Sequence, residues 1–138
     1  MSRILAIDFG RKKSGIAVTD PLRMIASPLT TVETSKLIEF LKKYIAEEEV
    51  GEIVVGEPKT MDNQPSDVAK YLNPFLGRLK KALPDIPVER VDERFTSRMA
   101  FQAMIDSGLR KKARQNKELV DSISASLILQ SYMEIKKI

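Results

Sequence analysis

The sequence of 138 residues contains no cysteine, no histidine and no tryptophan. Without cysteine there can be no disulfide, which fits a chain that works in a reducing compartment. The absence of histidine and cysteine excludes zinc sites built from those ligands, and it excludes Ser-His-Asp and Cys-His catalysis. Any chemistry must therefore use carboxylates, hydroxyls, lysine or arginine, or a metal held by oxygen ligands.

Long hydrophobic runs and a strong charge of one sign are also missing. No apolar segment approaches a membrane span and the N-terminus does not resemble a signal peptide, so we expect a cytoplasmic protein with no membrane partner. The 23 basic and 19 acidic residues give a net charge of +4, which is compatible with a polyanionic partner. The length and the 43% hydrophobic content predict one domain, residues 1–138, with a real core.

Hydrophobic periodicity predicts strands and helices in alternation after an N-terminal hairpin. The expected strands cover residues 4–8, 14–19, 29–32, 52–56 and 87–91. The expected helices run from a cap at Thr34 or Ser35 to about 48, from a cap at Ser66 through Leu79, from Thr96 or Ser97 to Gly108, and from about 117. In the second helix, Pro74 and Gly77 predict a kink or a break. This order predicts an α/β fold with one mixed sheet, antiparallel in its hairpin strands and otherwise parallel, flanked by helices.

Three groups of acids lie in unusual settings. Asp8 ends an apolar run that reads as a central buried strand, and the pair Asp92-Glu93 ends another strand. Asp121 shares an inward helical stripe with Ser124, Ala125 and Ile128. Each acid has an ordinary explanation by itself: an Asx turn for Asp8, and the favourable N-terminal end of a helix for the others. The carboxyl ends of strands in open α/β sheets are, however, where functional sites lie.

If these acids meet, their charges must be compensated. Two carboxylates about 4 Å apart repel by about 4 kcal/mol at an effective dielectric constant of 20. Such a cluster either keeps a proton with a raised pKa or binds a cation. Because the chain has no histidine to relay protons, the sequence favours Mg²⁺ or Mn²⁺. Metal ions in such sites activate water for attack on phosphodiesters.

Two basic groups flank these acids in the sequence. Charge runs of this kind are usually solvated, but their position makes contacts with phosphates more probable than chance. Few aromatic residues are interleaved with them, so recognition of backbone and shape is favoured over reading of bases. The residues of the two groups are Arg11, Lys12 and Lys13, and then Arg110, Lys111, Lys112, Arg114 and Lys117.

Four motifs together resemble the YqgF/RuvX family, in the family's order and over nearly the whole chain. They are Asp8-Phe9-Gly10 with the continuation from Lys12 to Asp20, Val55-Gly56-Glu57-Pro58 with Met61-Asp62, Asp92-Glu93-Arg94-Phe95-Thr96-Ser97, and Val120-Asp121-Ser122-Ile123-Ser124-Ala125 with Ile128-Leu129. The second motif departs from the family, because Glu57, Lys59-Thr60 and Asn63 replace the usual residues. Glu57 is either a further ligand or, as we favour, a charge in a loop.

The resemblance implies a ribonuclease H-like fold and a cytoplasmic nuclease that trims the 5′ end of precursor 16S ribosomal RNA. It implies that Asp8, Glu93 and Asp121 hold the metal, and we assign phosphate binding to the two basic groups together with Arg94. The partner would be structured RNA or branched DNA, and both monomer and homodimer remain open. The alternatives are a Holliday-junction resolvase-like enzyme and an RNA-binding assembly factor without catalysis. A nucleotide-binding phosphotransferase is disfavoured, since the chain is too short for the usual two domains and has no Gly-rich phosphate loop.

Overall fold

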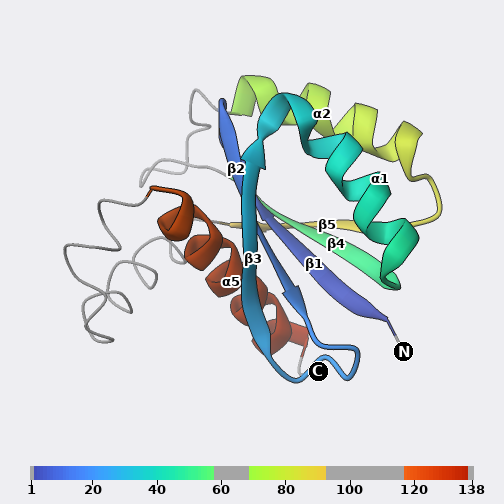
Figure 1. Cartoon of the computed structure of the whole chain (residues 1–138), viewed down its shortest axis with the longest axis vertical. Coiled ribbons are helices and arrows are strands. Elements are labelled where there is room, and N and C mark those ends of the chain that lie inside the picture. The colour runs from blue at the N-terminus through green and yellow to red at the C-terminus, as the bar shows by residue number, and fades with distance from the viewer. Residues whose placement is uncertain (1, 58–68, 93–116, 137–138) are drawn as a thin grey trace.

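Five strands form one mixed sheet in the order β3-β2-β1-β4-β5. The computed structural model describes residues 2–57, 69–92 and 117–136 (Figure 1). β1 pairs antiparallel with β2, and β2 with β3, whereas β1 pairs parallel with β4, and β4 with β5. The predicted mixed sheet is therefore confirmed. Its strands are β1 Arg3–Asp8, β2 Lys13–Thr19, β3 Ala26–Glu33, β4 Val50–Glu57 and β5 Val88–Asp92.

The helices lie on both faces of this sheet (Figure 1). The 3₁₀ helix η1 Thr34–Lys36 leads into α1 Leu37–Glu47, and α1 lies with α2 Ala69–Ala82 on one face. The long helix α5 Lys117–Lys136 covers the other face. The third predicted helix, from residue 96 or 97 to 108, lies outside the described residues.

β1 is the central strand because its apolar run is buried on both sides. Ile4, Leu5, Ala6 and Ile7 are all fully buried. Successive strand residues point to opposite faces, so Leu5 and Ile7 join the core beneath α1 and α2, while Ile4 and Ala6 join the core beneath α5. Burial of each large side chain contributes about 1.5–3 kcal/mol, which makes this strand the anchor of the sheet.

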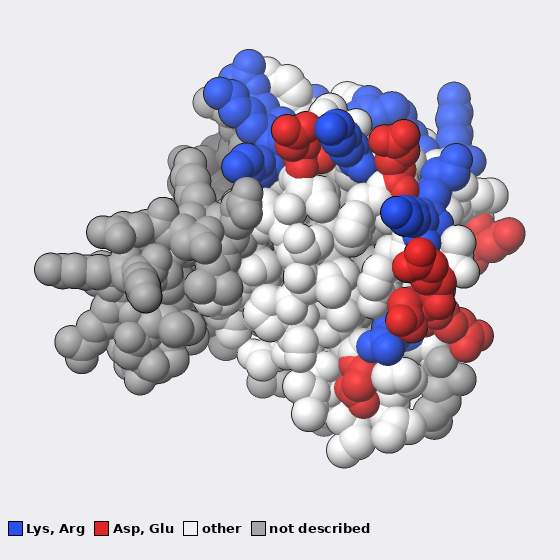
Figure 2. Space-filling model, viewed as in Figure 1, with Lys and Arg blue, Asp and Glu red and all other residues white. Residues whose placement is uncertain are grey.

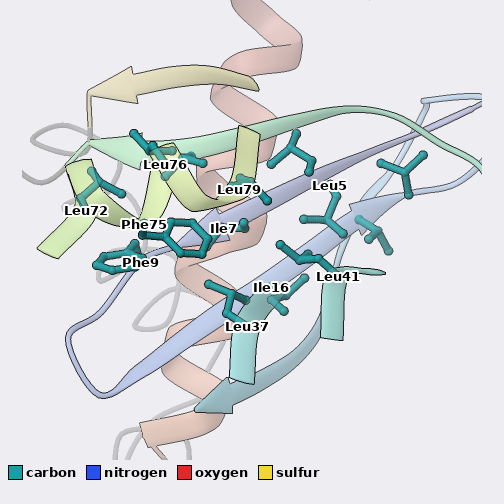
Figure 3. Close-up of a cluster of buried hydrophobic side chains, with 14 residues drawn as sticks. Leu5, Ile7, Phe9, Ile16, Leu37, Leu41, Leu72, Phe75, Leu76 and Leu79 are labelled. Atoms are coloured by element: carbon teal, nitrogen blue, oxygen red, sulfur yellow. The ribbon is translucent and has the colours of Figure 1, made fainter. Parts of the chain in front are cut away.

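The core beneath α1 and α2 is built from long aliphatic and aromatic side chains (Figure 3). Leu37 and Leu41 of α1 are fully buried, and Phe75 of α2 is 1% exposed. The rings of Phe9 and Phe75 lie with their centroids 5.1 Å apart, within the range that favours tilted aromatic pairs. This contact ties α2 to the residue that follows Asp8.

Helix α2 is continuous through Pro74, so of the predicted kink or break, the break is wrong and the kink stays a prediction. Proline removes one backbone hydrogen bond and clashes with the carbonyl four residues earlier, at a cost of about 3 kcal/mol. Here Leu72, Phe75 and Leu79 are all buried against the sheet, and this packing offsets the cost. Leu76 is buried on the same side of the helix. Ser66, the predicted cap, lies outside the described residues.

The predicted cap of α1 is also wrong. Neither η1 nor α1 begins with a hydrogen bond from a side-chain cap. The Thr34 hydroxyl instead donates to the Gly10 carbonyl at 2.6 Å, so it binds the β1–β2 turn rather than the helix. The Thr34 hydroxyl thus binds a residue that is distant in the chain instead of a backbone group of its own helix. The spacing of residues in the sequence does not reveal this contact.

Candidate functional site at the carboxyl ends of the strands

Three strands that run parallel end at the same edge of the sheet. β1 ends at Asp8, β4 at Glu57 and β5 at Asp92. Ile7 is paired with Val55, and Glu57 is paired with Asp92, so the three ends are in register. Glu57, which we expected in a loop, is the last residue of β4. The carboxyl ends of adjacent parallel strands therefore bring acidic positions together, as ligand sites in open α/β sheets require.

Asp8 lies on the face of the sheet that α5 covers. Ile4 and Ala6 share the α5 core, and alternation along β1 gives Asp8 the same face. Asp8 is partly buried and follows the fully buried Ile7. A carboxylate at the edge of such a core is costly unless charge or hydrogen bonds compensate it.

Glycines flank Asp8 on the neighbouring strands. Gly15 of β2 is the register partner of Asp8, and Gly56 of β4 follows Val55, the partner of Ile7. Paired residues on adjacent strands carry their side chains on the same face, so neither neighbour places a side chain beside this carboxylate. This role of the two glycines was not predicted from the sequence. Their occurrence in the first and second motifs was the available signal.

Helix α5 is long enough for its Asp121 position to reach the edge at which β1, β4 and β5 end. The Tyr132 hydroxyl donates to Glu52 Oε2 at 2.5 Å, which fixes one end of the helix beside the start of β4. From Tyr132 back to Asp121 the helix rises about 16 Å. From Glu52 forward to Glu57 the strand advances about the same distance. Because α5 runs opposite to β1 (Figure 1), the backbone of Asp121 lies level with the carboxyl ends of the strands.

The inward stripe predicted for α5 is confirmed at two of its positions. Ala125 is fully buried and Ile128 is 1% exposed, whereas Ser124 is partly buried. Ala6, Ala17 and Ala125 meet between α5 and the sheet. These small side chains let the helix approach the strands closely, which keeps the Asp121 position near the edge.

The β1–β2 turn holds the first basic group beside Asp8. The Gly10 N–H donates to Ser14 Oγ at 3.2 Å, and Thr34 Oγ lies 2.8 Å from Ser14 Oγ. Since the Thr34 hydroxyl donates to the Gly10 carbonyl, the Ser14 hydroxyl must be the donor to Thr34. A Cβ on Gly10 would lie 2.1 Å from the Lys13 carbonyl oxygen, so only glycine fits. The turn is therefore built tightly on hydroxyl contacts.

Arg11 is fixed against helix α2. Its guanidinium carbon lies 4.9 Å from the centroid of the Tyr71 ring, a cation–π contact worth about 0.5–1 kcal/mol at an exposed site. Lys12 and Lys13 are exposed next to it. Tyr71 was not predicted as a partner of Arg11, because the contact joins two elements that are distant in the chain.

Among the side chains that the structure describes, no group of three or more acids is placed to hold a metal ion. In residues 2–57, 69–92 and 117–136, no helix is long and apolar enough to cross a membrane. The predicted residues outside the described part of the chain are Glu93, Arg94, Arg110, Lys111, Lys112 and Arg114.

The arrangement of strands and helices defines a ribonuclease H-like protein. RuvC of T. thermophilus, solved in complex with a Holliday junction substrate, superposes with a TM-score of 0.60 and covers 96% of each chain at 16% identity. The profile of the RuvX family, described as Holliday junction resolvase, matches residues 2–135. The chain therefore belongs to the RuvX family, and the resemblance seen in its motifs is confirmed.

Curated relatives match the chain over nearly its full length. A protein of Phocaeicola vulgatus is 60% identical over 99% of both chains, and one of Flavobacterium johnsoniae is 56% identical over 99% of both. A protein of Bacteroides fragilis is 55% identical over 100% of both chains. All three bear the name "Putative pre-16S rRNA nuclease".

Proposed function

We propose that this protein is a metal-dependent nuclease that hydrolyses phosphodiester bonds, with the 5′ end of precursor 16S ribosomal RNA as its substrate. The observation that carries the proposal is the position of Asp8, which ends the central strand of a ribonuclease H-like sheet on the face covered by α5. Membership of the RuvX family supports the reaction class, and the names of the relatives support the RNA substrate.

Asp8, Glu93 and Asp121 are the residues that would hold Mg²⁺ or Mn²⁺. The donor set fits a hard cation, because carboxylate oxygens are its preferred ligands and the chain has no histidine or cysteine. Asp8 lies between two glycine positions, which leave room for a hydrated ion and a phosphate. Asp121 belongs to the helix whose backbone reaches the same edge.

We choose Glu93 over Asp92 for the third ligand. Val91 belongs to the core beneath α5, the face on which Asp8 lies. Alternation along β5 therefore gives the Asp92 position the face opposite to Asp8, which argues against Asp92 as a ligand. A site built this way takes its acids from β1, from the chain after β5 and from α5.

The bound ion and the residues of the chain would have different roles in the reaction. When bound, a divalent cation activates water and stabilises the departing oxygen of the phosphodiester. The carboxylates of the chain position that cation and, before it binds, repel one another and the substrate. Arg11, Lys12 and Lys13 hold a neighbouring phosphate, and the hydroxyl-braced turn fixes their distance from Asp8. Arg11 is further oriented by the Tyr71 ring.

Cleavage assays with matched variants test the proposal. Purified wild type, Asp8→Asn and the control Asp85→Asn are incubated with a precursor 16S RNA 5′ fragment and with a branched DNA junction, each with Mg²⁺, Mn²⁺ or EDTA. Asp85 is an exposed acid in the turn between α2 and β5. We expect cleavage of the RNA to need the metal, to fall at least a hundredfold in Asp8→Asn and to persist in Asp85→Asn.

The same assay distinguishes the alternatives. The description of the family favours branched DNA as the second candidate substrate, and preferential cleavage of the junction would establish it. Binding of RNA without metal-dependent product would indicate an assembly factor instead of a nuclease. Cleavage by Asp8→Asn at the wild-type rate would refute the proposed site.

A further inference from the structure

A groove lies between helix α2 and the edge strand β5, on the face of the sheet opposite to Asp8. It has a volume of about 400 Å³. We call it the α2–β5 groove. Its lining residues are Asn73, Leu76, Gly77, Lys80, Val88 and Arg90.

The two charged residues that line this groove, Lys80 and Arg90, are both basic and both exposed. Helix α2 carries Lys70, Arg78, Lys80 and Lys81 and no acid between Ala69 and Ala82. Glu89, the acid on β5 next to Arg90, interacts electrostatically with Tyr132 on the opposite face of the sheet. Figure 2 shows basic and acidic side chains interspersed along the α1 side of the molecule, and the surface over β3 almost without charge.

Gly77 keeps the groove open. A Cβ built on this residue meets no atom of the described residues within 4 Å beyond its own helix, so neither a tight contact there nor an unusual backbone conformation requires glycine. Glycine is unfavourable in a helix interior, and its presence without a packing reason leaves space that something else can fill.

The groove leads away from the candidate site. Arg90 lies two residues before the end of β5, about 7 Å from the edge where the acidic positions gather. Its guanidinium donates to Asn73 Oδ1, which joins β5 to the first part of α2. Lys80 lies seven residues further along α2, about 10 Å from Asn73.

We propose that the α2–β5 groove binds the phosphate backbone of the nucleic-acid strand that continues beyond the cleaved bond. The inference rests on the proposed function, because it assumes a nucleic-acid substrate at the acidic edge. Arg90 contacts the phosphate nearer to that edge, and Lys80 contacts one farther away. The space above Gly77 admits the sugar–phosphate chain. Recognition here is independent of sequence, since these cations face phosphates and the amide of Asn73 is bound to Arg90.

A salt titration of binding tests the groove separately from catalysis. Fluorescence anisotropy of labelled single-stranded oligouridylate and oligodeoxythymidylate is measured in EDTA for wild type, Arg90→Gln, Lys80→Gln and the control Lys42→Gln. Lys42 is an exposed cation on α1 outside the groove. Each groove variant should weaken binding about fivefold and lower the log–log salt slope by about 0.7. Lys42→Gln should match wild type.

A second pair of variants fills the groove without changing its cations. Gly77→Gln and Gly77→Glu place side chains of the same length into open space, and both should fold as wild type does by circular dichroism. The carboxylate should weaken binding at least fivefold relative to the amide. Equal binding by the two Gly77 variants would overturn the proposal. So would a wild-type salt slope in Arg90→Gln and Lys80→Gln, or a wild-type protein whose binding does not depend on salt. Because EDTA prevents metal-dependent cleavage, a protein that binds through the groove but never cleaves would refute the nuclease proposal alone.

Discussion

The phenol of Tyr132 and the carboxylate of Glu52 meet across 80 residues of sequence, with the hydroxyl donating to Oε2 at 2.5 Å. Arg23 holds the other oxygen of Glu52 at 3.0 Å and also donates to the Ser2 carbonyl. This network joins α5 to the sheet at the edge opposite to the candidate site. It therefore fixes the position of α5, and with it the level that Asp121 reaches.

Replacement of Tyr132 by Phe should lower the free energy of unfolding by about 1.5–3 kcal/mol, the usual contribution of a hydrogen bond to a charged group. Glu52 keeps its ion pair with Arg23, so the loss should not unfold the chain. Urea denaturation at neutral pH measures the change. Tyr71→Phe is the control, because Tyr71 is 43% exposed and keeps its ring contact with Arg11. Equal stability of the two variants would contradict this assignment.

The stability should also depend on alkaline pH through Tyr132. Burial and the hydrogen bond to Glu52 raise the pKa of Tyr132 above its ordinary value of 10. The stabilisation is therefore complete below about pH 10, where the phenol is protonated in both states, and it is lost as the pH rises toward the folded pKa. Wild type should lose more unfolding free energy than Tyr132→Phe between pH 9 and 11. If unfolding free energy falls with pH equally in the two proteins, this role of Tyr132 is refuted.

Replacement of Thr34 by Val should loosen the basic turn. The change keeps the shape of the side chain but removes the donor to the Gly10 carbonyl and the acceptor for Ser14, which is fully buried. We expect a loss of about 1–3 kcal/mol in unfolding free energy and faster amide exchange at Gly10. Thr30→Val on β3 serves as the control. Unchanged exchange at Gly10 would show that the hydroxyl contacts do not brace the turn.

Two Gly→Ala substitutions should have opposite effects. Gly10→Ala forces a Cβ to within 2.1 Å of the Lys13 carbonyl oxygen and should destabilise the protein through a shift of the turn. Gly77→Ala meets open space and should raise the unfolding free energy by about 0.5–1 kcal/mol, since alanine is favoured in a helix. Thermal denaturation of both variants measures the contrast. Similar shifts in the two variants would contradict the geometry.

Addition of Mg²⁺ or Mn²⁺ should stabilise the folded protein independently of any substrate. A ligand that binds only the folded state at one hundred times its dissociation constant adds about 2.7 kcal/mol. The melting temperature should therefore rise with metal in wild type and in Asp85→Asn, but not in Asp8→Asn. Sodium chloride at matched ionic strength controls for screening. An equal rise in Asp8→Asn would exclude Asp8 as a ligand.

Most of the strands could be predicted because their signals are local. The run from Ile4 to Ile7 is apolar at every position, and this alone indicates a central strand that is buried on both faces. The hairpin strand that starts near Ser14 and the final helix from Lys117 were likewise predicted to within a residue. The candidate site was predicted as far as Asp8, because its place at the end of that strand follows from the same pattern.

The predictions failed where a distant partner decided the outcome. Thr34 has the side chain of a helix cap, yet the carbonyl of Gly10, 24 residues away, takes its hydrogen bond. Pro74 should break a helix by its covalent structure, yet packing of its neighbours on the sheet keeps α2 intact. Spacing along the chain contains no information on either contact.

The sequence by itself determined which residue types are available, where the strands and helices lie and which acid ends the central strand, because composition and periodicity are properties of short segments. The tertiary structure decided which elements become neighbours. It placed Arg11 on Tyr71, Tyr132 on Glu52 and Arg90 beside α2. Those contacts depend on the order of strands in the sheet and on the approach of the helices to its faces, and these follow only from packing of the whole chain.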